Sequence, residues 1–175
     1  MTESQLHHRR SIRLKEYNYS EEGEYFITIV TQNRIHLFGE ISSEEMRLSP
    51  IGQIVQEEWL KTPSIRHEIE LGSYVIMPNH FHAIVHITNT EPSRGDRPVA
   101  PTKRPGLTKK SIGSLVAGFK SSATIRINRH RGLPGVPVWQ RNYYEHIIMS
   151  DDEYGRIDAY INSNPANWLN DPEFS

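Results

Sequence analysis

The order in which strand-like and helix-like segments follow one another limits the folds open to this chain more than any single residue does. Segments rich in β-branched and aromatic residues predict strands, and apolar residues at intervals of three and four predict helices. The predicted strands are 25–31, 68–77, 80–88 and 143–149, with a short one at 46–48. The predicted helices are 50–61, 111–129 and 151–163. This β-α-β-β-α-β order predicts an α+β protein with a ferredoxin-like four-stranded antiparallel sheet, helices on one face and an appended C-terminal helix.

The composition agrees with one domain that folds around its own core. Of the 175 residues 36% are apolar, and no apolar run approaches the ~20 residues of a membrane span. The absence of cysteine excludes disulfides, a cysteine nucleophile and thiolate metal ligands. Residues 1–17 lack the apolar stretch of a signal peptide, so we expect a cytoplasmic protein without a membrane partner. We expect a basic arm at 1–20 and a single domain at 21–170, with a flexible basic insertion at 90–110.

The charges of this chain are segregated, although their sum is only -1. Between Arg97 and Tyr144 there are ten basic residues and no acidic one, whereas the rest of the chain has ten basic and 21 acidic residues. Such a stretch attracts phosphate backbones by counterion release, although a solvated loop beside an exposed helix face has the same pattern. The basic residues that we expect to contact DNA are Arg9, Arg10, Arg13, Lys109, Lys110, Lys120, Arg126, Arg129 and Arg141.

Two histidines alternate at the start of the strand predicted at 80–88. Side chains two positions apart in a strand point to the same face, so His80 and His82 project together while Phe81 points to the other face. Two parallel imidazoles are a natural half of a divalent-metal site. The alternative is a pair of surface histidines that happen to alternate.

A tyrosine and an asparagine share one face of the last predicted helix. Tyr160 and Asn164 are four residues apart, which is about one helical turn. A phenol and an amide oxygen in this arrangement can address the same metal-bound phosphate. The alternative is that Tyr160 is a half-buried helix tyrosine and Asn164 a helix cap before Pro165.

Taken together, the ordered motifs resemble one family. The stretches VIMPNHFHAIV, VWQRNYYEHII and YINSNP follow one another at similar spacings, and RLKEYNYSEEGEYFITIVTQNRIHLFGE is similar to the N-terminal part of the same family. The chain resembles the HUH-type single-tyrosine transposases of the IS200-like superfamily, and within them the REP-associated tyrosine transposases. The resemblance extends from about Arg13 to Trp168.

The resemblance implies a set of site residues. His80 and His82 match the pair that holds a divalent ion, Mg²⁺ or Mn²⁺, and Asn164 matches the polar residue that completes the metal shell. Tyr160 matches the nucleophile. The motif at 143–146 has no role that we can assign, and Tyr143 or Tyr144 is a rival nucleophile.

The resemblance also implies a reaction and a partner. Relatives cleave and rejoin single-stranded DNA next to hairpins formed by palindromic repeats, through a 5′-phosphotyrosine intermediate, and act as a monomer or a homodimer. One alternative is a non-catalytic, domesticated nucleic-acid-binding protein on the same fold. Another is a metal-dependent hydrolase of small molecules, although such an enzyme has no need of ten basic residues in one stretch.

Overall fold

A computed structural model describes residues 22–88 and 111–173 of the chain. The predicted arm at 1–20 and the insertion at 90–110 lie outside the described residues. The expected DNA contacts that fall there are Arg9, Arg10, Arg13, Lys109 and Lys110.

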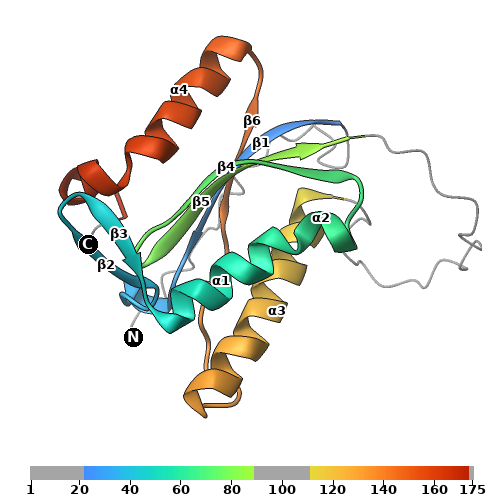
Figure 1. Cartoon of the computed structure of the whole chain (residues 1–175). Coiled ribbons are helices and arrows are strands. Elements are labelled where there is room, and N and C mark those ends of the chain that lie inside the picture. Colours follow the sequence, from blue (N-terminus) through green and yellow to red (C-terminus); the bar gives the residue numbers. More distant parts are fainter. Residues whose placement is uncertain (1–21, 89–110, 174–175) are drawn as a thin grey trace, which may run out of the picture.

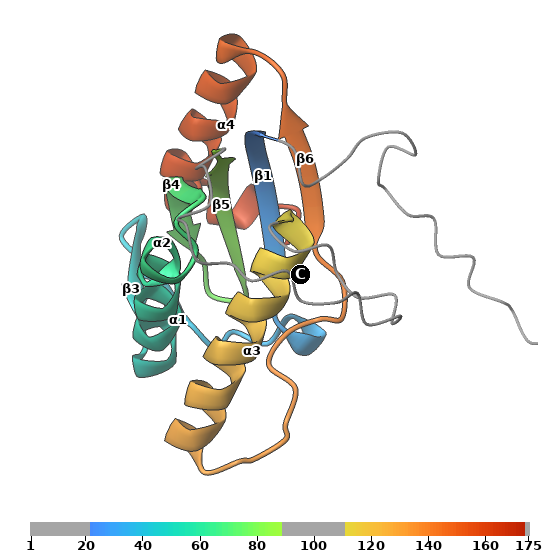
Figure 2. The same cartoon turned by 90° about the vertical axis from the view of Figure 1, so that its right-hand side faces the viewer.

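Four antiparallel strands form the central sheet, as the sequence predicts. They are β1 (Gly23–Val30), β4 (Ile69–Ile76), β5 (His80–Ile87) and β6 (Tyr144–Ile148). Their order across the sheet is β4-β5-β1-β6, and Figure 2 shows them side by side in this order. The two central strands β1 and β5 pair along their whole length, from Gly23 with Ile87 to Val30 with His80. The strand that begins with the histidine pair is therefore central in the sheet.

A bulge interrupts the pairing of β4 with β5. The register shifts between Leu71 and Tyr74, at the Gly72-Ser73 pair where a glycine within a strand predicts such an irregularity. A side chain at Gly72 would have its Cβ 3.0 Å from the side chain of Ile84 on the neighbouring strand. Glycine therefore allows the two strands to approach closely at this point.

Two long helices cover one face of the sheet (Figure 1). They are α1 (Pro50–Leu60) and α3 (Ile112–Arg131), and the one-turn helix α2 (Thr62–Ile65) follows α1. The side chains of Ser49 and Ser111 accept hydrogen bonds at the two N-termini, and α3 ends at Gly132, whose φ of 65° suits glycine. The main core lies between these helices and the sheet, and Trp59 of α1 packs on Phe81 of β5 within it.

The last helix covers the opposite face. Helix α4 (Asp151–Ser163) begins with Ser150 as its N-cap and has three acidic residues in its first turn, which the helix dipole favours. It packs on the sheet through Ile161, which is fully buried against a small apolar cluster with Ile84 and Ile148. A 3-10 helix, η2 (Pro165–Asn170), continues the chain. Figure 1 shows α4 and the pair α1 and α3 on opposite sides of the sheet.

A small hairpin beside the main sheet differs from the expectation of a single strand at 46–48. Strands β2 (Gly39–Ser42) and β3 (Glu45–Leu48) pair with each other, after the 3-10 turn η1 (Gln32–Arg34). Ser43 and Glu44 make the turn with φ of 53° and 63°, values that are typical of a type I′ turn. The sequence does not reveal β2 because this turn lacks the glycine or asparagine that usually marks one. Within the described ranges no helix has the length and apolar character required to span a bilayer.

Candidate metal and tyrosine site

The histidine pair lies on the face of the sheet that α4 covers. His80 and His82 are both buried, with 0% and 3% of their surface exposed, and their ring centres are 4.4 Å apart. Phe81 between them belongs to the core on the opposite face, as alternation along a strand requires. Burial of both rings excludes the alternative of two surface histidines.

Each imidazole is oriented by a hydrogen bond at its Nδ1 atom. Asn79 Nδ2 donates to the backbone oxygen of Glu173, so Asn79 Oδ1 is the atom that accepts from Nδ1 of His80, at 2.9 Å. His80 therefore carries its proton on Nδ1, which leaves a lone pair on Nε2. Thr28 Oγ1 lies 2.8 Å from Nδ1 of His82, and this hydrogen bond fixes the orientation of that ring. Partners of this kind orient histidines that ligate metals.

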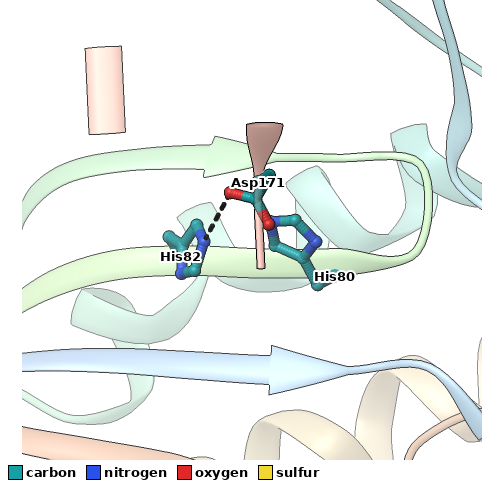
Figure 3. A group of neighbouring side chains, drawn as sticks. All are labelled: His80, His82 and Asp171. Carbon is teal, nitrogen blue, oxygen red and sulfur yellow. Dashed lines mark ion pairs between the residues drawn. The ribbon is translucent and has the colours of Figure 1, made fainter. Parts of the chain in front are cut away.

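A third side chain, Asp171, completes the group. Its carboxylate oxygens lie 3.9 Å from His80 Nε2 and 4.0 Å from His82 Nε2. Figure 3 shows the carboxylate over the two rings of β5, with its contact to His82 marked by a dashed line. These three residues form the group of metal-ligating side chains found within the described residues. Two ligands of one ion lie within about 4.2 Å of each other when each bond is about 2.1 Å, so the spacing suits a metal between them.

The sequence-based prediction did not include Asp171, which lies one residue beyond the domain end expected at 170. The segment after η2 is held against the sheet by Asn79 and by an ion pair of 2.7 Å between Arg34 and Glu173. The backbone N–H of Glu173 also donates to Asp171 Oδ1 at 2.7 Å. An acid seven residues after Asn164 is only a weak sequence signal, because the 3-10 helix that returns it to β5 has no periodic pattern.

Tyr160 and Asn164 reach the same group from α4. The Tyr160 hydroxyl donates to Asp171 Oδ2 at 2.9 Å and lies 3.3 Å from His82 Nε2. Asn164 is 1% exposed and donates through Nδ2 to the same carboxylate oxygen at 2.7 Å. The two residues that the sequence places on one helix face therefore both bond to Asp171, and Tyr160 also contacts His82.

Burial and charge shift the pKa values of these groups. Burial lowers the pKa of His80 to about 4, and burial together with the neighbouring His80 lowers the pKa of His82. Burial alone would raise the pKa of Asp171, but hydrogen bonds from Asn164 and from a backbone N–H lower it. Burial, and then the adjacent Asp171 carboxylate, raises the pKa of Tyr160 above its ordinary value of 10. At neutral pH the site thus has two neutral imidazoles, one carboxylate and a protonated phenol.

Two buried atoms at the site are left without a partner. His80 Nε2 and Asn164 Oδ1 make no hydrogen bond with the described residues. A buried acceptor without a partner is costly in free energy, and such atoms are rare in native proteins. Both atoms are acceptors that suit a cation, and together with the Asp171 carboxylate they fit a divalent metal ion. The described residues of this site could therefore bind a metal.

The two rival tyrosines lie elsewhere on the sheet. The Tyr143 hydroxyl donates to Glu145 at 2.6 Å, and Tyr143 packs against the core under α1 and α3. Tyr144 is 41% exposed at the start of β6. The hydroxyl that bonds to the metal-ligating group is that of Tyr160.

Lys120, one of the expected DNA contacts, is bound within the protein. Its ammonium donates to the backbone oxygens of Gln140 and Asn142 at 2.9 and 2.8 Å, and burial lowers its pKa to about 8. These bonds attach α3 to the segment that leads into β6. Lys120 thus stabilises the packing of this segment on α3.

Arg126 is also paired within the protein. Its guanidinium forms ion pairs of 2.6 and 2.7 Å with Glu57 and Glu58 of α1. Arg129 and Arg141 are exposed. Helix α3, which carries Lys120, Arg126 and Arg129, lies on the opposite side of the sheet from α4 (Figure 1), the helix that carries Tyr160.

Comparisons with known proteins agree with this fold. A solved structure of a REP-associated tyrosine transposase bound to a REP hairpin superposes with a TM-score of 0.57 at 20% identity, over 90% of this chain and 74% of that chain. The chain thus has the same fold as this transposase. No protein-family model matches it.

A relative of similar length defines the family. The chain is 41% identical over 169 residues to an uncharacterized protein of Haemophilus influenzae, and the match covers 95% of this chain and 93% of that protein. The chain belongs to the same family as this Haemophilus influenzae protein.

Proposed function

We propose that this protein is a metal-dependent single-strand DNA transposase or endonuclease with Tyr160 as its nucleophile. The observation that carries the proposal is the position of the Tyr160 hydroxyl, which contacts both Asp171 and His82. A phenol beside neutral histidines and a carboxylate combines a nucleophile with the ligands of a divalent ion. The transposase fold supports the same reaction class.

The metal ligands in this proposal are His80, His82 and Asp171, with the unpartnered Oδ1 of Asn164 as a fourth. Nitrogen and oxygen ligands without a thiolate suit Mg²⁺ or Mn²⁺. A bound ion would offset the negative charge that develops on the phosphate. Thr28 and Asn79 would hold the two rings in the orientation that ligation needs.

The chemical step is a transesterification. The Tyr160 oxygen forms a bond to phosphorus while the bond from phosphorus to the 3′-oxygen breaks, which leaves a 5′-phosphotyrosine and a 3′-hydroxyl. The proton lost by the phenol balances the proton gained by the 3′-oxygen. Asp171 already accepts the hydrogen bond of this proton. The phosphotyrosine ester conserves the energy of the broken bond, so the strand can be rejoined to another end.

Single-stranded DNA with hairpins is the proposed substrate. The structural neighbour was solved bound to a REP hairpin. The exposed Arg129 and Arg141, and the basic residues of the arm and the insertion, are the proposed contacts to the phosphate backbone. Lys120 and Arg126 are unsuited to this role because their charges are already engaged.

The test is formation of a covalent adduct. We expect the protein, incubated with Mn²⁺ and hairpin-containing single-stranded DNA, to give a protein–DNA adduct that survives denaturing electrophoresis. Tyr160→Phe should abolish the adduct, whereas Tyr154→Phe on the same helix should retain it. His80→Ala with His82→Ala, and separately Asp171→Asn, should lower its rate by at least a hundredfold.

An adduct that still forms with Tyr160→Phe would show that the nucleophile is another residue. Salt-dependent DNA binding with no adduct under any metal would support the non-catalytic alternative.

A further inference from the structure

A groove lies between β6, β1 and α4, next to the site. It is open to the surface and has a volume of about 300 Å³, which is the lower end of the range for small-molecule sites. The residues that line it are Phe26, Tyr144, His146, Glu153, Arg156 and Ile157. Two of them belong to the motif at 143–146 that the sequence left without a role.

The sheet register connects the groove to the site. Thr28 of β1 pairs with His82 on one side and with Tyr144 on the other, so these three side chains lie in one row on the same face. Phe26 stacks on the His82 ring at 5.3 Å, and its ring centre is 6.3 Å from that of Tyr160. Because neighbouring strands are about 4.8 Å apart, Tyr144 lies roughly 10 Å from the histidine pair. The groove therefore begins where the proposed scissile phosphate would lie.

The groove has the surface chemistry that a nucleobase requires. Phe26 and Tyr144 provide aromatic surface, and their ring centres are 6.2 Å apart in an edge arrangement that leaves Tyr144 41% exposed. His146 Nε2 bonds to Glu153 Oε1 at 2.7 Å, and the other Glu153 oxygen accepts the backbone N–H of Met149 at 2.8 Å. The rim thus presents a carboxylate and an imidazole in a fixed orientation.

The side chain of Arg156 also lines the groove. Arg156 is exposed on α4 and lies close enough to Glu153 to lower the pKa of that carboxyl, after the hydrogen bonds of the Met149 N–H and His146. A guanidinium can pair with a phosphate or with the acceptor edge of a base. Aromatic rings, a hydrogen-bonding pair and an arginine in one groove match a nucleotide better than they match an apolar ligand.

We propose that this groove binds the nucleotide next to the scissile phosphate and so contributes to the choice of the cleavage position. This inference rests on the proposed function, because it takes the DNA substrate from it. Tyr144 stacks on the base, Arg156 pairs with the backbone or base edge, and the His146–Glu153 pair contacts the hydrogen-bonding edge of the base. The motif at 143–146 would therefore serve substrate positioning through Tyr144 and His146.

The first experiment measures binding without cleavage. A decamer of thymidylate labelled with a fluorophore is titrated with the Tyr160→Phe protein at fixed salt. We expect Tyr144→Leu in that background to weaken binding about tenfold, which is the effect of losing one stacked base. Tyr144→Phe should retain the affinity, because it keeps the ring. Met149→Ala is the matched control, since its side chain is 77% exposed and does not line the groove.

The second experiment measures the choice of cleavage position. Wild-type protein and Tyr144→Leu are incubated with Mn²⁺ and a hairpin followed by a randomised single strand, and the cleaved ends are sequenced. We expect the wild type to prefer certain bases beside the cut and the variant to lose this preference, with the adduct still dependent on Tyr160. Arg156→Gln should reduce the affinity for the decamer by a factor of about three to ten.

The outcomes separate this inference from the proposed function. Unchanged decamer affinity and unchanged base preference in Tyr144→Leu would overturn the inference, whereas a Tyr160-dependent adduct would still support the proposed function. Binding that depends on Tyr144 without any adduct would support the groove and overturn the proposed cleavage. A protein that binds no single-stranded DNA would overturn both. Thermal melting of each variant checks that the fold is retained, which we expect because Tyr144 is exposed.

Discussion

At the scale of residues, burial and then the Asp171 carboxylate keep the Tyr160 phenol protonated. Asp171 provides the carboxylate that the Tyr160 hydroxyl contacts, and its charge opposes ionisation of the phenol. An ordinary tyrosine is protonated at neutral pH, and Tyr160 is more strongly so. Any ion bound between His80 and Asp171 would offset this charge, so nucleophile activation and metal binding involve the same carboxylate.

We therefore predict that Asp171→Asn lowers the pKa of Tyr160 in the metal-free protein. The substitution removes a negative charge and a strong acceptor, so it favours the phenolate relative to the wild type. Nuclear magnetic resonance of tyrosine labelled with ¹³C at Cζ, assigned with Tyr160→Phe, measures the shift. Asp158→Asn is the control, because the Asp158 charge raises the pKa of Tyr154 instead. An unchanged Tyr160 titration would contradict the described contact.

The buried histidines make stability depend on pH. Their folded-state pKa values are below the unfolded value of about 6.5, so the unfolded chain binds more protons and stability falls as the pH decreases. For His80 the loss occurs between pH 6.5 and about 4, and it amounts to roughly 3 kcal/mol.

We expect urea unfolding of the metal-free protein to show this loss between pH 7 and pH 4.5, and His80→Gln to reduce it. Saturating Mn²⁺ should raise the unfolding free energy at pH 7 and have less effect below pH 4, where protons compete with the metal for the His80 nitrogen. A free energy of unfolding that is constant over this range would show that the pKa values of the rings are the same in the folded and unfolded protein.

At the scale of elements, α4 is attached to the sheet by a narrow apolar contact. Ile161 is its fully buried residue and packs with Ile84 and Ile148. The rest of the contact includes Tyr154 and Ile157, which are only partly buried. The position of Tyr160 relative to β5 therefore depends strongly on the adjacent Ile161.

We predict that Ile161→Ala destabilises the protein by about 2–4 kcal/mol and lowers the rate of adduct formation. Removing three methylene-sized groups leaves a cavity between α4 and β5, so the helix is held less firmly. Chemical unfolding measures the loss, and hydrogen exchange should increase in α4 before it increases in β5. Ile125→Ala is the control, because Ile125 is 58% exposed on α3 and should change stability by less than about 0.5 kcal/mol. Equal losses from both substitutions would contradict the role of Ile161 as an anchor.

At the scale of the whole molecule, the core and the candidate site lie on opposite faces of the sheet. The face under α1 and α3 holds the main core, with Trp59 and Phe81 at its centre. The face under α4 holds the histidines, the tyrosine and the groove. Basic residues of α3 lie on the core side, so DNA that contacts both Arg129 and Tyr160 has to pass around an edge of the sheet.

This arrangement predicts different effects of three arginines on DNA binding. Replacing Arg129 and Arg141 together by Gln should reduce the slope of log K against log salt by about 1 to 1.5, because each phosphate contact on a single strand releases about 0.7 counterion. Arg126→Gln should leave the slope unchanged and cost at most about 1 kcal/mol of stability, since it breaks surface ion pairs with Glu57 and Glu58. Fluorescence anisotropy at four salt concentrations measures the slopes. A reduced slope for Arg126→Gln alone would show that these ion pairs open to DNA.

Local patterns along the chain were enough to predict the class of fold and part of the site. Strand and helix periodicities predict the order of elements, and alternation along β5 places His80 and His82 on one face. Helical spacing places Tyr160 beside Asn164. These predictions succeed because each depends on neighbours within one element, whose geometry is the same in any protein.

The remaining features depend on contacts between segments far apart in the chain. Asp171 joins the histidines because Asn79 and Arg34 hold the segment after η2, which no periodic pattern indicates. The guanidinium of Arg126 is paired with Glu57 and Glu58 of another helix. A count of charges along the chain cannot reveal that pairing. Periodicity describes the geometry within an element, whereas the packing of distant segments decides which side chains meet and which charges remain available.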